Sequence, residues 1–145
     1  MVGPTLVLVR HEELSGVHLD GLRRMFDGEY ARDFGDWDPE QPYGYAPHDI
    51  YVIARDHRGI VGHVGWARRT IVVGARHVVI AGVGGVIVAG RARGSRLGSI
   101  LMDVTAGSIA DAYQQFLVTR RTWLESENRR LGPNRGEGDL GEQQL

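Results

Sequence analysis

Short runs of apolar and β-branched residues recur over the first 90 positions of the chain and favour β-strands. The predicted strands are Thr5–Arg10, Ile50–Arg55, Ile60–Ala67, Arg68–Val73, Arg76–Ala81 and Val83–Val88. The turn residues at positions 56–59 predict a β-hairpin, and Gly74-Ala75 separates a later pair of runs. Because Val83–Val88 is apolar on both faces, we expect it to be a central, covered strand.

Apolar residues recur at helical spacing in longer segments. The first predicted helix is Ser15–Tyr30, with Ser15 as a favourable capping residue. A second helix is predicted at about Ser95–Tyr113. Beyond it, Phe116–Thr119 predicts a short strand and Trp123–Leu131 predicts a third helix, which Gly and Pro terminate.

These elements, in this order, predict an α+β fold with a mixed, mainly antiparallel sheet and helices on both faces. In Asp33–His48 the apolar residues follow neither the helical nor the strand spacing. We interpret this segment as a long loop of the kind that is often functional. We expect one domain over residues 1–132. Residues 133–145 are polar and have little to bury, so we expect a disordered tail there.

Composition excludes several classes of function. The formal net charge of -1 does not indicate binding to nucleic acid or to an anionic membrane. Cysteine is absent, which removes disulfides, thiolate metal sites and a cysteine nucleophile. Lysine is also absent, so any anion site must use arginine or backbone amides. Without a signal peptide or an apolar run long enough to span a bilayer, we expect a soluble, cytoplasmic protein.

The strongest chemical signal is a Gly- and Arg-rich turn between Val83–Val88 and the second predicted helix. The first N–H groups of a helix lack internal partners and point beyond its N-terminus, so such a turn favours an anion. Gly94 permits close backbone approach, and Arg91, Arg93 and Arg96 add forked donors suited to phosphate. Taken alone, the turn fits a solvated loop equally well.

The segment GVGGVIVAGRARGSRLGSILM, residues 82–102, resembles motif A of the GNAT N-acetyltransferase superfamily, in which a V-x-V strand precedes R/Q-x-x-G-x-G/A at the start of a helix. Arg93 takes the first position of that pattern and Gly98 the last, while Arg96 replaces the usual middle glycine. The RGxRL form is most similar to the aminoglycoside 2'-N-acetyltransferases. Gly62–Gly74 is similar to the rhizobial nodulation N-acyltransferases.

The resemblance implies that acetyl-CoA or another acyl-CoA is the co-substrate, with its pantetheine arm lying along the V-x-V strand. The cofactor contacts that it implies are Val86, Ile87, Val88, Arg93, Gly94, Ser95, Arg96, Leu97, Gly98 and Asn128. A strand amide from Val86 or Ile87 would stabilise the charge that develops on the thioester oxygen.

Acyl transfer to an amine needs a base for the amine and an acid for the leaving thiolate. In the resembling families a Glu and a Tyr serve these roles, but Gly84 and Asn128 occupy the matching positions. We propose Asp33 and Asp36 as catalytic candidates, because this loop lines the acceptor cleft in the family. The alternative is a solvated acidic loop. His63 is either a base or, as is more usual for a lone histidine in an apolar strand, a hydrogen-bonded core residue.

The sequence therefore predicts an acyl-CoA-dependent N-acyltransferase that acts on a primary amine of a small molecule, such as an aminoglycoside or aminosugar. A catalytically impaired CoA-binding module, and an α+β domain whose arginine loop binds another anion, stay open as alternatives. GNAT domains continue with two more strands after the last helix. These strands are not evident here, so two explanations stay open: a partner chain, such as a second copy in a homodimer, covers the open sheet, or the chain is a shortened product.

Overall fold

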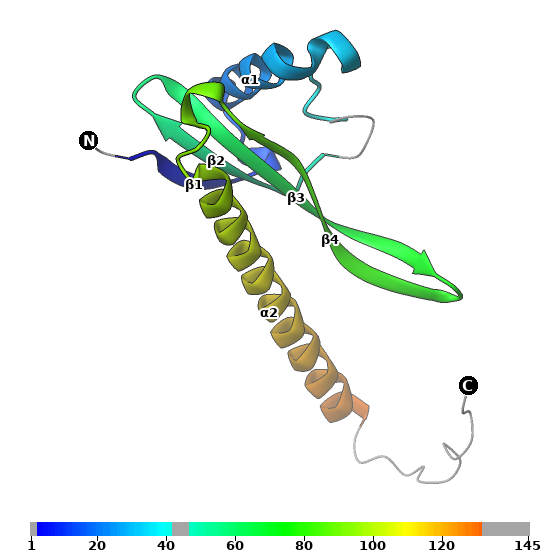
Figure 1. Ribbon diagram of the computed structural model, residues 1–145. Helices are drawn as coiled ribbons and strands as arrows, with labels where there is room; N and C mark the ends of the chain where they lie inside the picture. The colour runs from blue at the N-terminus through cyan, green and yellow to red at the C-terminus, as the bar shows by residue number, and fades with distance from the viewer. Residues whose placement is uncertain (1–2, 42–46, 132–145) are drawn as a thin grey trace. The chain divides into compact units, whose positions relative to one another are not determined.

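The computed structural model describes residues 3–41 and 47–131, with side chains up to residue 115 (Figure 1). Its elements are β1 (Thr5–Arg10), the 3-10 turn η1 (His11–Glu13), α1 (Gly16–Phe34), β2 (Ile50–Asp56), β3 (Gly59–Val73), β4 (Arg76–Val88), the 3-10 turn η3 (Gly90–Ala92) and α2 (Leu97–Leu131). The fold belongs to the α+β class that the sequence predicts.

The four strands form one sheet in the order β1-β2-β3-β4, and every pair is antiparallel. The predicted hairpin of β2 and β3 is confirmed. A second hairpin joins β3 to β4 at Gly74-Ala75, where Gly74 adopts a φ of 62° that favours glycine. Pairing continues without interruption through Arg68 and Gly82. The runs predicted as separate strands on each side of this turn are therefore single long strands.

Strand β4 is the outer strand of this sheet, and the prediction of a central strand at Val83–Val88 is wrong. Val83 and Val86 are 43% and 48% exposed. The apolar pattern has another cause, because Ile87 packs into the core beside α1 whereas Val88 packs against the core beside α2. The edge of β4 thus remains open among the described residues.

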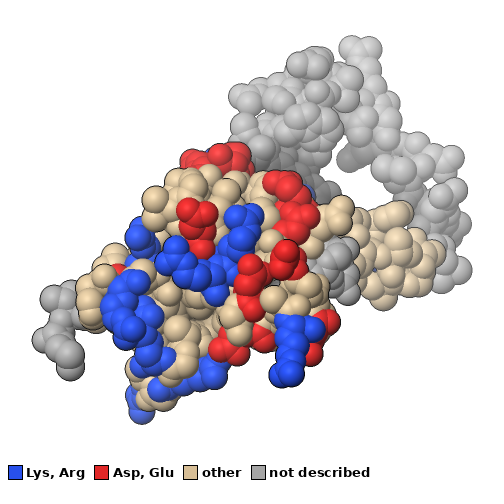
Figure 2. Space-filling model, turned by 90° about the horizontal axis from the view of Figure 1, so that it is seen from above, with Lys and Arg blue, Asp and Glu red and all other residues tan. Residues whose placement is uncertain are grey.

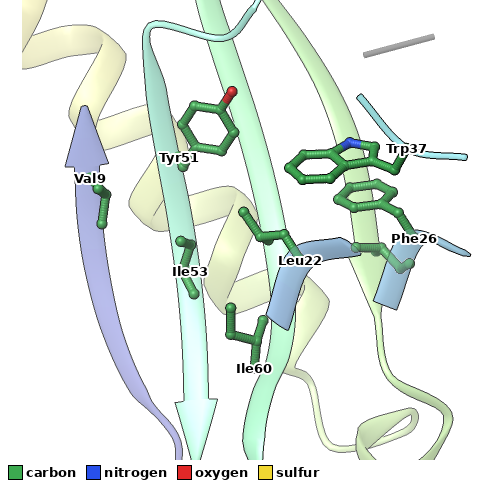
Figure 3. Close-up of a cluster of buried hydrophobic side chains, with 8 residues drawn as sticks. Val9, Leu22, Phe26, Trp37, Tyr51, Ile53 and Ile60 are labelled. Atoms are coloured by element: carbon green, nitrogen blue, oxygen red, sulfur yellow. The ribbon is translucent and has the colours of Figure 1, made fainter. Parts of the chain in front are cut away.

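Two apolar clusters lie on opposite faces of the sheet, because successive residues of a strand point to opposite sides. The cluster beside α1 contains Val9, Leu22, Phe26, Trp37, Tyr51, Ile53, Ile60 and Ile87 (Figure 3). The other cluster contains Val52, Ala54, Val61, Val64, Leu97 and Leu101. Helix α1 therefore covers one face and the first turns of α2 the other, which confirms the prediction of helices on both faces.

Helix α1 begins after Ser15, as predicted, and the Ser15 hydroxyl accepts a hydrogen bond from the His18 N–H. It ends at Phe34, so it is longer than predicted. Gly35 follows with a φ of 76°. Asp33 consequently lies in the last turn of a helix, whereas the sequence placed it in a loop.

Helix α2 runs without a break from Leu97 to Leu131, which overturns the prediction of a strand at Phe116–Thr119 and of a separate helix at Trp123–Leu131. Four β-favouring residues are too few to stop a helix that contains no proline and is flanked by strong helix formers such as Gln, Arg and Leu. No helix within the described residues is apolar over a length that would span a membrane.

The chain divides into two compact units, residues 1–108 and residues 109–145. The first unit contains the whole sheet, α1 and the first turns of α2. Within it, the Trp66 indole N–H donates to the Ser108 hydroxyl at 3.1 Å and ties α2 to β3. The tail predicted at residues 133–145 lies outside the described residues.

Candidate functional site

A β-bulge interrupts the edge strand β4 just before the predicted anion loop. His63 pairs with Ile87 and Gly65 pairs with Gly84, so two residues of β4 lie opposite the single residue between the paired positions of β3. Gly85 in this bulge has a φ of 61°, a conformation that side chains rarely adopt. The bulge therefore redirects the backbone where the resemblance places the reactive end of the cofactor.

His63 is completely buried beneath this bulge and fixes its shape. Its Nδ1–H donates to the Gly85 carbonyl at 2.7 Å. Burial, with a smaller contribution from His48, lowers the pKa of His63 to about 3, although the bond to Gly85 opposes the shift. The imidazole is therefore neutral at pH 7, and its Nε2 has no partner among the described residues. Of the two interpretations of His63, the hydrogen-bonded core residue is the one observed.

His48 is a second buried imidazole at the bulge, and no sequence pattern predicted its position. Its ring fills the space that glycines leave: a Cβ at Gly65 would lie 2.2 Å from Cδ2 of His48, and one at Gly84 would lie 3.5 Å from Cε1. Burial is the largest cause that lowers the pKa of His48 to about 4, with Arg69 next. Its Nδ1 has no hydrogen-bond partner within the described part of the chain.

Asp49 anchors the segment that carries His48. The Asp49 N–H donates to the Trp66 carbonyl at 2.9 Å, and its carboxylate accepts from the Arg68 N–H at 2.6 Å. The Asp49 carbonyl accepts from the His11 N–H at 3.1 Å. These bonds reach β3 and the end of β1, so the ring of His48 has a defined position although it lies in a segment without regular structure.

Tyr51 links this buried group to the surface through a chain of hydrogen bonds. Its hydroxyl lies 3.1 Å from Nδ1 of His11, and Nε2 of His11 lies 3.0 Å from Oε1 of Glu40. In the tautomer that donates Nε2–H to the carboxylate, Nδ1 of His11 accepts the Tyr51 hydroxyl proton. Burial raises the pKa of Tyr51 to about 12, although a backbone bond from His48 opposes this.

The loop between β4 and α2 presents backbone amides that have no partner. The N–H groups of Gly94 and of residues 96–98 meet no protein acceptor among the described residues. Gly94 and Arg96 have φ values of 84° and 65°, so the chain turns sharply before Leu97 anchors the helix in the core. The Arg96 side chain is exposed and makes no ion pair within the described residues. Such a turn can hold an anion on backbone amides.

Arg93, which the resemblance assigned to the pyrophosphate, is engaged by the protein itself. Its Nη2 donates to the Glu29 carboxylate of α1 at 2.8 Å, and its Nε donates to the Val88 carbonyl at 3.2 Å. Arg93 therefore ties the loop to α1 and to the end of β4. The Ser95 hydroxyl likewise bonds within the loop, to the Ala92 carbonyl. This leaves the amides and Arg96 as the groups that face no internal partner.

A pocket of about 300 Å³ opens at the bulge and is lined by Tyr30, Phe34, Gly85 and Val86. Of the predicted catalytic carboxylates, Asp33 is exposed and lies three residues after Tyr30 on α1, which places it on the same side of that helix. Asp36 is exposed in the bend that follows, outside the pocket lining. The structure thus brings Asp33 near the pocket and leaves Asp36 apart.

Five further residues have defined places in the fold. Trp37 anchors the segment after α1, because it is buried and stacks on Phe26 with ring centroids 5.2 Å apart (Figure 3). Asn128 lies in α2, where the structure does not describe its side chain. Val86 is exposed on the edge strand, Ile87 is buried, and Val88 is partly buried.

An antiparallel sheet whose bulged edge strand leads through a Gly- and Arg-rich turn into a helix is the arrangement expected of a GNAT-like N-acyltransferase. A family model described as "NodA: Nodulation protein A (NodA)" matches residues 5–136, and the chain belongs to this family. ElaA of Escherichia coli has a similar fold, with a TM-score of 0.53 and 18% identity over 72% of this chain and 68% of ElaA. No curated protein sequence matches the chain. The predicted GNAT-like fold is thereby confirmed.

Proposed function

We propose that this protein transfers an acyl group from an acyl-CoA to a primary amine of a small molecule, such as an aminosugar or aminoglycoside. The observation that carries the proposal is the continuity of an open, bulged strand edge with a loop of unpartnered amides. A thioester with an amide-containing arm and a pyrophosphate matches these two surfaces in that order. Membership of the nodulation protein A family supports acyl transfer as the chemistry.

The donor lies along the outer edge of β4 in this proposal. The pantetheine amides pair with the backbone of Val86–Val88, as an added strand would. The pyrophosphate rests on the amides of Gly94 and residues 96–98, with Arg96 as its forked partner. The thioester then reaches the bulge, where a strand N–H stabilises the oxyanion. Arg93 holds the loop in place through Glu29 and Val88 and acts as a positioning residue.

The acceptor amine enters the pocket formed by Tyr30 and Phe34 beside the bulge. The Asp33 carboxylate at its rim attracts the ammonium group. The ammonium group loses one proton to solvent, and the resulting neutral amine attacks the thioester carbonyl carbon, so a C–N bond forms and the C–S bond breaks. The amine gives up one proton, and the sulfur leaves as the CoA thiolate, which takes up a proton to become the free thiol.

For the proton acceptor we propose His48. A Glu at position 84 serves in the families that the sequence resembles. Here the side chain that stands over Gly84 is the imidazole of His48, whose Nδ1 is unpartnered. Burial keeps the ring in the neutral form that has a free lone pair, and the same lowered pKa makes it a weak base. The sequence did not reveal this role, because His48 lies in an aperiodic segment 36 positions before Gly84.

A transfer assay tests the proposed function. The full chain is incubated with acetyl-CoA or a longer acyl-CoA and a panel of amines that includes glucosamine and an aminoglycoside. Thiol release and the mass of the acylated amine are then measured. His48→Asn and Asp33→Asn should each lower kcat/KM by at least about tenfold, whereas Arg76→Gln at the far hairpin should not. Absence of both thiol release and acylated product across the panel would overturn the proposal.

A CoA-binding protein without catalysis is the second candidate. The observation in its favour is that the residues lining the bulge pocket include no titratable group except Tyr30. It predicts that CoA binds and protects the Arg93–Gly98 loop while no amine yields free thiol. Calorimetric binding without turnover would select it over the transferase.

A further inference from the structure

The distal part of the β3–β4 hairpin extends beyond the other strands of the sheet. Strand β2 begins at Ile50, whose partner on β3 is Trp66, so the later residues of β3 have no strand on that side within the described chain. From residue 69 to residue 80 the described strands pair only with each other. We call this two-stranded segment, residues 69–80, the hairpin arm; in Figure 1 it is the green hairpin that passes the end of β2.

The hairpin arm exposes apolar side chains on both of its faces. Because side chains alternate along a strand, Ile71, Val73 and Val78 share one face, whereas Val72 and Val79 share the other. All five are exposed, and Val72 and Val73 are the most open, at 64% and 56%. Contiguous exposed aliphatic side chains mark an interaction surface, and a lone two-stranded ribbon is only marginally stable in water. The arm therefore favours an apolar partner that can surround it.

Positive charge accompanies these apolar side chains, and no acidic residue nearby in the sequence offsets it. Residues 57–102 contain seven arginines and no Asp or Glu, although the whole chain has a formal net charge of -1. Arg76 lies beside the turn of the arm, is exposed and forms no ion pair within the described residues. Arg68 and Arg69 lie at the base of the arm. Figure 2 shows a tan surface at the right, where the arm projects, without acidic side chains on the visible face.

Charge and shape together distinguish the partners that could cover this surface. A second copy of the arm would bring further arginines and no carboxylate to pair with them, so like charges would repel. Single-stranded nucleic acid stacks on aromatic side chains, and the arm contains no Phe, Tyr or Trp. A rigid protein surface would cover one face of the ribbon, whereas a fluid lipid layer surrounds both. An anionic phospholipid surface also supplies phosphates directly above an apolar layer.

We propose that the hairpin arm docks this protein on an anionic phospholipid surface. The valine and isoleucine side chains enter the boundary between headgroups and acyl chains, to a depth of about 5–10 Å. The long side chain of Arg76 extends back to the phosphates, as cationic side chains do at this boundary. The arm stays at this boundary, because the outer edges of its strands carry unpaired N–H and C=O groups that need water. The inference is independent of the proposed transfer reaction, whose site contains no residue of the arm.

Co-sedimentation of the full chain with lipid vesicles tests the proposal. Vesicles of phosphatidylcholine alone are compared with vesicles of phosphatidylcholine and phosphatidylglycerol in equal parts. The protein should bind the anionic vesicles at least about tenfold more tightly, and added salt should reduce this difference. Hydrogen exchange at residues 70–79 should slow on the anionic vesicles. Equal binding to both kinds of vesicle, or binding to neither, would overturn the proposal.

Two variants separate the apolar contribution from the charged one. The double variant Val72→Thr, Val73→Thr keeps the β-branched shape that suits a strand and should lower binding to anionic vesicles by about tenfold. Arg76→Gln should lower it by about fivefold. The matched controls are Val17→Thr and Arg23→Gln, which change a valine of similar exposure and an exposed arginine on α1 and should leave binding nearly unchanged. If both arm variants bind like the wild type, the lipid contact lies elsewhere and the proposal is wrong.

A second copy of the chain is the alternative occupant, and sedimentation velocity without vesicles tests it. The wild type and the arm variants should have the same oligomeric state at every concentration. In the transfer assay without lipid, Arg76→Gln should match the wild type, so a failure of lipid docking is distinguishable from a failure of the proposed function. A wild-type dimer that the Val72→Thr, Val73→Thr variant abolishes, together with no vesicle binding, would make the arm a contact between copies and overturn the inference.

Discussion

Three glycines at the β3–β4 bulge make room for two buried imidazoles. Gly65 and Gly84 face each other across the strands beneath the ring of His48, and Gly85 curves around His63. At the residue scale, the sequence could predict that His63 is a hydrogen-bonded core residue, because it alternates with apolar neighbours. It could not predict the position of His48, which depends on three hydrogen bonds of Asp49 to distant segments, two through its backbone and one through its carboxylate.

Substitution of Gly65 by Ala tests this packing. The added Cβ would lie 2.2 Å from the His48 ring, which Asp49 holds in place, so we expect a loss of about 1–3 kcal/mol in the free energy of unfolding. Gly28→Ala is the matched control, because a Cβ there meets nothing within 4 Å on α1 and should stabilise by about 0.5–1 kcal/mol. Urea denaturation measures both. Equal stability of Gly65→Ala and the wild type would show that His48 does not occupy this space.

The two imidazoles also predict how stability depends on pH. Their folded pKa values of about 4 and about 3 lie below the unfolded value of 6.5, so the unfolded chain binds more protons between these limits. Stability is therefore full above pH 6.5 and falls as the pH drops toward 4 and then 3, by on the order of a few kcal/mol. His63→Gln should flatten this fall relative to the wild type in urea denaturation series. Parallel curves for the two proteins would contradict the assignment.

At the scale of elements, local patterns predicted where helices begin and where hairpins turn. Ser15 and Gly74 are examples, because capping and left-handed turns are decided by single residues. The lengths of the helices and the positions of the strands in the sheet were harder to predict. The apolar character of Val83–Val88 was read as central burial, whereas Ile87 and Val88 contact two different cores from an edge strand. Similarly, Phe116–Thr119 favours a strand by composition but continues α2, since helical neighbours on both sides outweigh four residues.

The role of the loop after β4 became sharper once its contacts were known. The sequence motif treated Arg91, Arg93 and Arg96 as equivalent phosphate ligands. In the structure Arg91 pairs with Asp56 and Arg93 with Glu29, and only Arg96 is without an ion pair among the described residues. The backbone amides of the loop thus carry more of the proposed anion binding than its side chains do.

At the scale of the whole molecule, the candidate site lies within the unit of residues 1–108. The open edge of β4 and the amide loop follow one another along a continuous stretch of chain, and Arg93 at the start of the loop is bonded to α1. One extended donor with a thioester and a pyrophosphate would engage both surfaces. The parts of such a donor thus correspond to the parts of the fold.

Hydrogen–deuterium exchange of the full chain with and without acyl-CoA tests this claim most directly. With acetyl-CoA or a longer acyl-CoA in large excess, exchange should slow at residues 85–88 and at residues 94–98. It should stay unchanged at the β3–β4 turn, residues 72–77, which lies away from the site. Unchanged exchange in both predicted segments, or protection confined to other parts of the chain, would contradict the account.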